Sequence, residues 1–270
     1  MQRLFFNSSM PRSGSELLQV ILHQNPLIYA SSTSPLLEYQ YGARSNYNLP
    51  EVMSQEPHTM AAAFINMCHG MAHSYYSAIT NRPYIIDKNR GWTHYYEWVD
   101  QWNMAPKMIC MVRDLRSILA SFERIYRINR HNPVGPDNPA AIKNMTVVQR
   151  VEHWLSTQPI GLALQRTIDT FQRKIDKNIL FVKYEDLCNK PDETMNKIYC
   201  YLQIEYFQHD FNNIKKQVYE DSKYFGPFGD HSIKPVLKSV KPRDWEDIYE
   251  DSSFIVNSNR WYFDVFNYEV

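Results

Sequence analysis

The feature that most constrains the fold is an N-terminal apolar run that stops at a short polar loop and continues as a helical pattern. Residues 2–8 read as a strand, Pro11-Arg12-Ser13-Gly14-Ser15 forms the loop, and apolar side chains recur at helical spacing over 17–22. A strand–loop–helix of this kind directs backbone N–H groups and a helix N-terminus at one point, which attracts phosphate or sulfate. Arg12 would add a positive charge and a planar set of donors. The sequence therefore predicts a helix over 15–24 beside an anion site.

The composition favours one large domain without a general affinity for nucleic acid. The chain has 270 residues, of which 44% are hydrophobic, and this suffices for a single large core. Lys plus Arg and Asp plus Glu both number 29, so the formal net charge is zero, whereas nucleic-acid binders usually carry a basic excess. We expect a single domain over 1–270, a local anion site and no nucleic-acid partner.

No targeting segment is visible in the sequence. No secretion signal precedes the first strand, and no apolar run approaches the ~20 residues of a membrane span. We therefore expect a cytoplasmic protein without a membrane span.

The cysteines and histidines do not form a recognisable metal site. None of the four cysteines belongs to a CxxC pair, and we expect them to be buried thiols: Cys68, Cys110, Cys188 and Cys200. Because no His/Cys cluster has the spacing of zinc ligands, no metal site is expected.

Strands alternate with helices along the chain. Further strands are expected at 83–87, 107–112 and 179–182, and helices at 58–79, 92–103, 115–125, 146–175 (kinked at Pro159) and from Pro191 to Leu202. Residues 27–56 and 129–145 are rich in breakers and are expected to be irregular. This alternation predicts an α/β fold of three layers, with a central parallel sheet and helices on both faces. Ligands of such sheets bind beyond the carboxyl ends of the strands.

Three polar motifs directly follow predicted strands. Arg113 ends the third strand, and Ser121 lies eight residues further on the polar face of a helix. This pair suits a second phosphate, or is simply part of a solvated helix face. Lys88 can reach into the cleft as a mobile charge, or lie on the surface. Tyr184 can stack on or hydrogen-bond a base, or fill the core.

Together these motifs resemble those of sulfotransferases that use 3′-phosphoadenosine 5′-phosphosulfate (PAPS). The order and spacing of the motifs carry the resemblance, which runs from residue 2 to about 203 and more weakly near 228–241. The combination of Arg12 with Lys88 is most similar to the tyrosylprotein and bacterial or phage-type branches. The resemblance implies a P-loop-like α/β fold and PAPS as the sulfuryl donor.

The resemblance also implies a role for each motif. Arg113 and Ser121 correspond to the 3′-phosphate site, and Tyr184 of Tyr184-Glu185-Asp186 corresponds to the residue that meets adenine. A late loop that closes on the nucleotide corresponds to His231, Ser232 and Lys234. The 5′-phosphosulfate loop corresponds to Pro11, Arg12, Ser13, Gly14, Ser15, Glu16 and Leu17.

Two positions depart from the family pattern. The family usually has two threonines after the loop glycine, where this chain has Ser15 and Glu16. Ser15 keeps a hydroxyl, and we expect Glu16 to point outward and cap its own helix. Cytosolic members have a histidine base two residues after the lysine, and this position is Arg90 here.

The mechanism implied is in-line transfer of a sulfuryl group to an acceptor hydroxyl. Arg12 and Lys88 would stabilise charge on the sulfuryl and bridging oxygens, and no metal is needed. A general base should take the acceptor proton. Our candidate is Glu38, 26 residues after Arg12 in the region expected to cover the cleft, and weaker candidates are His58, His69 and His73.

The acceptor should be held by the segments near 33–60 and 126–146. These contain aromatic and basic side chains that suit a sugar, a phenol or an acidic peptide, or that pack as ordinary loops: Tyr39, Tyr41, Tyr47, Arg127, Arg130 and His131. The resemblance implies a hydroxyl-bearing acceptor that is a sugar, phenol, lipid or peptide, because one fold serves many substrates.

Two other functions compete with this interpretation. A P-loop kinase is suggested by Tyr84-Ile85-Ile86-Asp87, which could be a Walker B strand with a Mg²⁺-binding acid. The first loop, however, lacks the G-x-x-x-x-G-K-[ST] pattern. An inactive nucleotide-binding scaffold is suggested by Glu16 and by the missing histidine.

Overall fold

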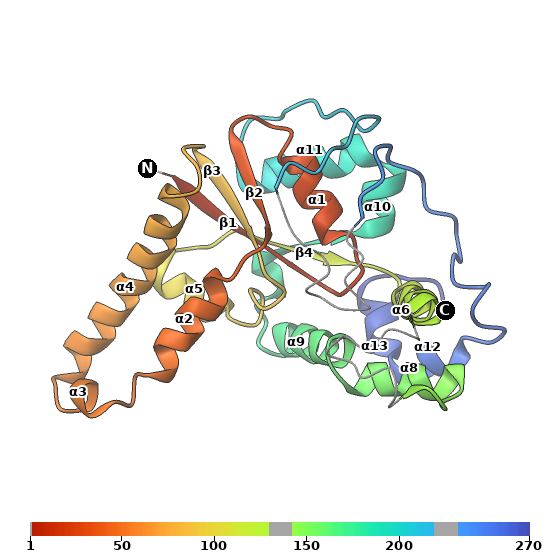
Figure 1. Ribbon diagram of the computed structural model, residues 1–270, viewed down its shortest axis with the longest axis horizontal. Helices are drawn as coiled ribbons and strands as arrows, with labels where there is room; N and C mark the ends of the chain where they lie inside the picture. The colour runs from red at the N-terminus through yellow and green to blue at the C-terminus, as the bar shows by residue number, and fades with distance from the viewer. Residues whose placement is uncertain (1, 130–141, 219–231) are drawn as a thin grey trace.

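Five parallel strands form the centre of the computed structural model, which describes residues 2–129, 142–218 and 232–270 (Figure 1). The strand order is β2-β3-β1-β4-β5. The strands are β1 (Arg3–Ser9), β2 (Ile28–Thr33), β3 (Tyr84–Lys88), β4 (Met108–Val112) and β5 (Ile179–Lys183). All four pairings are parallel. The four strands expected from the sequence are confirmed, and the sheet is parallel, as predicted.

Alternate side chains of each strand supply two separate cores. Phe5 and Ile86 face one core, whereas the adjacent Phe6 and Ile85 face the other. In β4 the same alternation divides five buried residues between the two faces. A sheet that is buried on both sides needs helices on both sides, so the strand sequences themselves require three layers.

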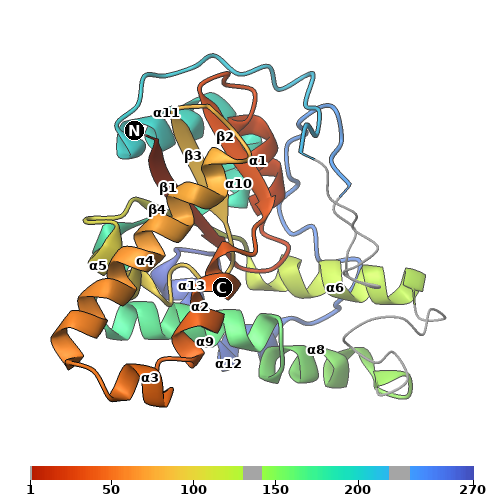
Figure 2. The ribbon, with the colours of Figure 1, turned by 60° about the vertical axis from the view of Figure 1, so that its left-hand side comes forward.

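One face of the sheet is covered by α1 (Ser15–Leu22) and α11 (Pro191–Leu202), with the short α10 (Tyr184–Asn189) beside them. The other face is covered by a larger group of helices (Figures 1 and 2). This group consists of α4 (Pro57–Ser77), α5 (Tyr96–Trp102), α6 (Leu115–Asn129), α8 (Val147–Ser156), α9 (Ile160–Gln172), α12 (Ser253–Ser258) and α13 (Arg260–Val265). A short 3-10 helix, Asp176–Asn178, leads into β5.

The expectation that residues 27–56 are irregular is wrong. They contain β2, α2 (Leu36–Ser45) and α3 (Pro50–Met53). The prolines lie at the boundaries of these elements, so they end structure instead of preventing it. β2 is an edge strand with a polar second half, Ser31-Ser32-Thr33, and this half gives no apolar signal.

Two predicted helices are also shorter than expected. The expected helix over 146–175 is two helices, α8 and α9, separated around Pro159. The expected helix over 92–103 begins only at Tyr96, because residues 91–95 form turns.

Three cysteines are buried as expected, but Cys200 is exposed, since it lies on the outer side of α11. In the three described ranges, no helix combines the length and apolar character needed to span a membrane.

Candidate functional site

The principal cavity lies at the carboxyl ends of the strands. α1 follows β1 onto one face of the sheet and α6 follows β4 onto the other, so the chain diverges between these neighbouring strands. Such a divergence leaves a crevice at the strand ends. The cavity measures about 750 Å³. Its lining includes two carboxylates, Glu16 and Asp244, and several cations: Arg12, Lys88, Arg90, Arg113, Lys234, Lys238 and Lys241.

The loop after β1 is held rigidly against β4. The Ser13 hydroxyl is fully buried and lies 2.7 Å from the Met10 carbonyl oxygen and 3.0 Å from that of Met111. Arg12 and Gly14 both have positive φ, 56° and 80°. Left-handed residues between a strand and a helix turn successive N–H groups toward one side, which is the geometry of an anion site. The loop therefore has the backbone conformation that an anion site requires, held in place by Ser13.

Position 14 requires a glycine for two reasons, its positive φ and its close approach to the ring of Tyr184. A Cβ at this position would lie 2.4 Å from Cδ2 of Tyr184. The ring of Tyr184 therefore packs directly on the loop, and burial raises the pKa of its hydroxyl to about 12. A flat aromatic face beside an anion loop is suited to a nucleoside base.

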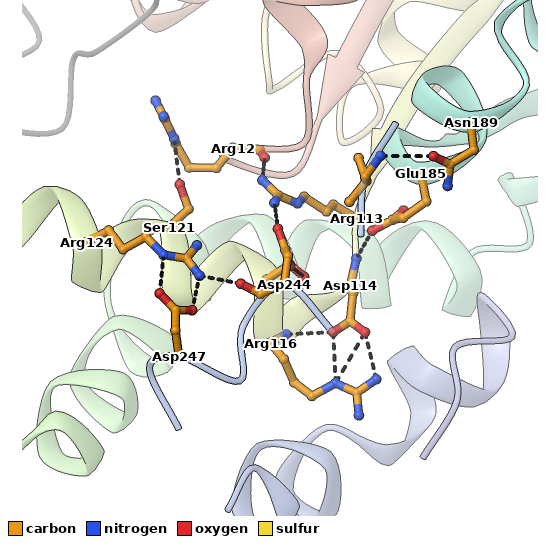
Figure 3. Close-up of polar contacts among 12 residues, drawn as sticks. Arg12, Arg113, Asp114, Arg116, Ser121, Arg124, Glu185, Asn189, Asp244 and Asp247 are labelled. Atoms are coloured by element: carbon orange, nitrogen blue, oxygen red, sulfur yellow. Dashed lines mark hydrogen bonds and ion pairs between the residues drawn. The ribbon is translucent and has the colours of Figure 1, made fainter. Parts of the chain in front are cut away.

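Arg113 connects several parts of the site (Figure 3). One terminal nitrogen donates to the Arg12 carbonyl oxygen at 3.1 Å, and the other donates to Asp244 Oδ2 at 2.6 Å. The guanidinium also lies over the ring of Tyr184, 4.7 Å from its centroid. Arg113 Nε is buried and has no hydrogen-bond partner among the described residues. A buried donor of this kind is suited to an additional anionic ligand.

The two members of the predicted second phosphate site have different partners. Ser121 accepts a hydrogen bond of 3.2 Å from Arg12 Nε, whereas Asp244, the acid paired with Arg113, also accepts one from Ser117. Arg124 donates to the Asp244 backbone and to Asp247 (Figure 3). α6 therefore supplies Ser117, Ser121 and Arg124 as partners of two residues that line the cavity, Arg12 and Asp244.

Glu16 does not point outward, so that expectation is wrong. Glu16 is only 8% exposed, and its Oε2 lies 2.7 Å from Nζ of Lys88. Its Oε1 accepts from the Ser32 hydroxyl at 3.1 Å and lies 3.2 Å from Nζ of Lys216. Lys88 also donates to Thr33 Oγ1 at 3.1 Å. Two ammonium groups and a hydroxyl compensate the buried carboxylate, and this outweighs the weak gain from an exposed helix cap.

Asp87 is placed differently from a metal-binding acid. It is fully buried, with Oδ2 2.5 Å from the Tyr76 hydroxyl and Oδ1 2.7 Å from Trp92 Nε1. Burial raises the pKa of the Asp87 carboxyl. Both carboxylate oxygens of Asp87 thus accept hydrogen bonds from Tyr76 and Trp92, and none of the three residues lines the cavity. Asp87 is therefore not available to bind Mg²⁺, as the Walker B interpretation would require.

The remaining sequence candidates are distributed unevenly. Pro11, Ser15, Leu17, Ser232 and Lys234 line the cavity, whereas His231 lies outside the described residues. Glu38 is exposed on α2, and neither it nor His58, His69 or His73 is among the lining residues. Among the described residues, no group of three or more His, Cys, Asp or Glu is arranged to hold a metal ion.

Sequence reasoning missed Lys216, Lys238, Lys241 and Asp244. Lys238 and Lys241 follow the candidate Lys234 in one stretch without a predicted strand. This repeated positive charge is the sequence signal that could have found them. Asp244 gave none, because a single acid in a loop has many ordinary positions.

The profile of the sulfotransferase family matches residues 5–208. The chain belongs to the sulfotransferase family. Among solved structures, the sulfotransferase domain of the Synechococcus PCC 7002 olefin synthase is 18% identical, with a TM-score of 0.53 over 100% of this chain and 96% of that one. The sulfotransferase domain from the curacin biosynthetic pathway is 16% identical, with a TM-score of 0.51 over 100% and 99%.

A third solved relative, mouse sulfotransferase SULT7A1 complexed with PAP, is 17% identical, with a TM-score of 0.52 over 97% of this chain and 83% of that one. A search of curated proteins gives no match to this sulfotransferase. The likeness to the three structures confirms the P-loop-like α/β fold expected from the sequence.

Proposed function

We propose that this sulfotransferase takes its sulfuryl group from PAPS and transfers it to an acceptor hydroxyl as a single domain. The observation that carries the proposal is the pair of cationic centres around Tyr184. The anion loop lies on one side of this ring, where Gly14 touches it, and the Arg113 guanidinium lies over it. A nucleotide that carries a base and two anionic groups, at the 3′ and 5′ positions of one ribose, matches this arrangement.

The residues present fit such a nucleotide. Pro11–Leu17 offers backbone donors and the Ser15 hydroxyl to the 5′ group, and Arg113 with Ser121 would hold the 3′-phosphate. Arg113 Nε is a buried donor with no partner among the described residues, as expected for a site completed by a ligand. Ser232 and Lys234 would contribute from the late loop. PAP in the mouse relative supports the same donor.

The chemistry required of the protein is positioning and charge stabilisation. In the transfer, the acceptor oxygen forms a bond to sulfur while the bond from sulfur to the bridging phosphate oxygen breaks, and adenosine 3′,5′-bisphosphate (PAP) leaves. Arg12 and Lys88, which both line the cavity, would stabilise the negative charge on the sulfuryl and bridging oxygens. No step of this reaction depends on a metal ion.

The acceptor proton needs a base. Glu38 stays our candidate from sequence, and its exposed position on α2 means that it serves only an acceptor lying along that helix. Figures 1 and 2 both show α2, α3 and the first half of α4 projecting from the sheet as an arm. Tyr39 and Tyr41 on this arm are 55% and 51% exposed. We propose that the arm receives the hydroxyl-bearing acceptor, which is a sugar, phenol, lipid or peptide.

The test is calorimetric titration with PAP in the absence of metal, beside titration with ATP and Mg²⁺. Binding of PAP but not of ATP is expected. The reverse result would indicate a kinase, and binding of neither would refute the donor site. An acceptor screen with PAPS then separates an enzyme from an inactive scaffold, which would bind PAP and transfer nothing.

A further inference from the structure

We propose that Glu16 is a positioning residue for sulfuryl transfer, which acts by fixing the Lys88 ammonium at the donor site. The inference rests on the proposed use of PAPS. It assigns a purpose to a residue that otherwise looks unfavourable, since a carboxylate in the first turn of the anion-loop helix should repel an anion.

The contact between these residues is short and shielded from water. Glu16 Oε2 and Lys88 Nζ are 2.7 Å apart, with side-chain exposures of 10% and 7%. A charged group withdrawn from water to this extent is costly to the fold unless a partner of opposite charge compensates it. In the described part of the chain, Glu16 is the only carboxylate that forms an ion pair with Lys88.

The neighbouring acid cannot replace Glu16. Asp87 precedes Lys88, but its oxygens accept from Tyr76 and Trp92 on the opposite side of β3. The Glu16 carboxylate also pairs with a second cation, since Lys216 Nζ lies 3.2 Å from its Oε1. Without Glu16, Lys88 would lose its ion-pair partner among the described residues and keep the Thr33 hydroxyl as an acceptor.

The pairing leaves Lys88 able to act on the donor. An ammonium has three N–H groups, and Glu16 and Thr33 accept two of them. These two are its acceptors among the described residues, and we assign the third N–H to a sulfuryl or bridging oxygen. The flexible lysine is thereby fixed at two points, and because Lys88 and Lys216 share one carboxylate, the cluster keeps a net positive charge for the anion.

The first experiment measures the reactivity of Lys88 without any ligand. Competitive acetylation of lysines at one fixed pH, read by mass spectrometry, reports how readily each lysine reacts. In Glu16→Gln the acetylation of Lys88 should become faster than in the native protein, because the carboxylate that holds its amino group is gone. The matched control is Glu193→Gln, which removes the exposed partner of Lys190 at 3.9 Å and should leave the acetylation of Lys190 unchanged. Unchanged acetylation of Lys88 in a folded Glu16→Gln protein overturns the proposal.

The second experiment tests whether Glu16 acts through Lys88. Conversion of PAPS to PAP with water as acceptor is measured for Glu16→Gln, Lys88→Ala and the double variant. Glu16→Gln should slow the reaction by roughly tenfold or more, but should add little once Lys88 is absent. Equal losses in both backgrounds would overturn the proposal. Glu16→Asp, which keeps the charge, should recover part of the rate, and thermal unfolding identifies any variant that fails to fold.

The two experiments separate this inference from the proposed function. If the native protein binds neither PAP nor PAPS, the donor assignment fails while the acetylation of Lys88 still reports the pairing. If PAP binds normally and the acetylation of Lys88 is insensitive to Glu16, the positioning role alone fails.

Discussion

The guanidinium of Arg113 lies 2.6 Å from the carboxylate of Asp244 (Figure 3) and over the ring of Tyr184, whose centroid is 4.7 Å from Cζ. Asp244 also accepts a hydrogen bond from Ser117 on α6. In this structure an internal carboxylate thus neutralises the arginine to which we assign the 3′-phosphate. The two residues should therefore affect nucleotide affinity in opposite directions.

Arg113→Ala should weaken PAP binding by about 2–4 kcal/mol, because a shielded, charge-assisted contact is lost. Calorimetry with PAP measures the change. Arg260→Ala is the matched control, since Arg260 is an exposed arginine on α13 that pairs only with Asp264 among the described residues. Unchanged affinity in a folded Arg113→Ala protein would remove Arg113 from the 3′-phosphate site.

Asp244→Asn should instead tighten PAP binding by about tenfold, equivalent to ~1.4 kcal/mol, since the carboxylate beside Arg113 no longer opposes a phosphate dianion. The same change should lower thermal stability, because Arg113 and Ser117 lose a charged acceptor. Thermal unfolding and calorimetry measure the two effects on one sample. Weaker binding would show that Asp244 orients Arg113 for the nucleotide instead of competing with it.

Much of the site could be predicted because its motifs follow strands directly. The loop at 11–15, Lys88, Arg113 and Tyr184 each come at the carboxyl end of a predicted strand, and parallel strands bring those ends together. Local sequence therefore sufficed for these positions. The family pattern added the roles.

The partners of these residues could not be predicted in the same way. Arg113 and Asp244 are 131 residues apart in sequence, and nothing near Asp244 indicates which arginine it meets. Glu16 was expected to face solvent because its neighbours along the chain do not reveal Lys88 and Lys216. β2 was missed because half of it is polar, and it is polar because it ends beside Lys88 at the cavity.

Gly14→Ala should disturb the loop through both conformation and contact. A left-handed φ of 80° costs a side-chain-bearing residue roughly 1–2 kcal/mol, and the new methyl group would collide with Tyr184. We expect lower stability together with weaker PAP binding. Gly70→Ala on α4 is the control, since a Cβ added at this position would meet no other atom within 4 Å. That substitution should stabilise the protein by about 0.5–1 kcal/mol. Equal stability of the two variants would contradict the assigned strain.

Stability should fall as the pH is lowered from about 6.5 to about 4 because His209 is buried as the neutral form. His209 is only 4% exposed, and burial lowers the pKa of its imidazole from 6.5 to about 4. In this window the unfolded chain binds the proton more readily than the folded one, so acid favours unfolding. The effect is absent above about pH 7, where both forms are neutral. Burial lowers the pKa of His23 in the same direction.

Urea unfolding at about pH 7.5 and about pH 5 measures this dependence. His209→Phe should reduce the difference between the two pH values, whereas His58→Gln, at an exposed position, should leave it unchanged. An identical pH dependence in His209→Phe and the native protein would show that other groups control acid stability.

Arg12→Ala should slow sulfuryl transfer by roughly 10²–10³-fold, because a fixed donor for developing negative charge is removed. The fold should survive, since the Arg12 side chain contacts Ser121 at the cavity and the loop is held by Ser13. PAP affinity should change much less than the rate, because the backbone donors and Arg113 remain. Release of PAP from PAPS measures the rate, and calorimetry measures the affinity. Arg44→Ala, on the exposed face of α2, controls for the loss of one positive charge. A rate that falls only as far as PAP affinity would make Arg12 a binding residue and leave Lys88 to stabilise the transition state alone.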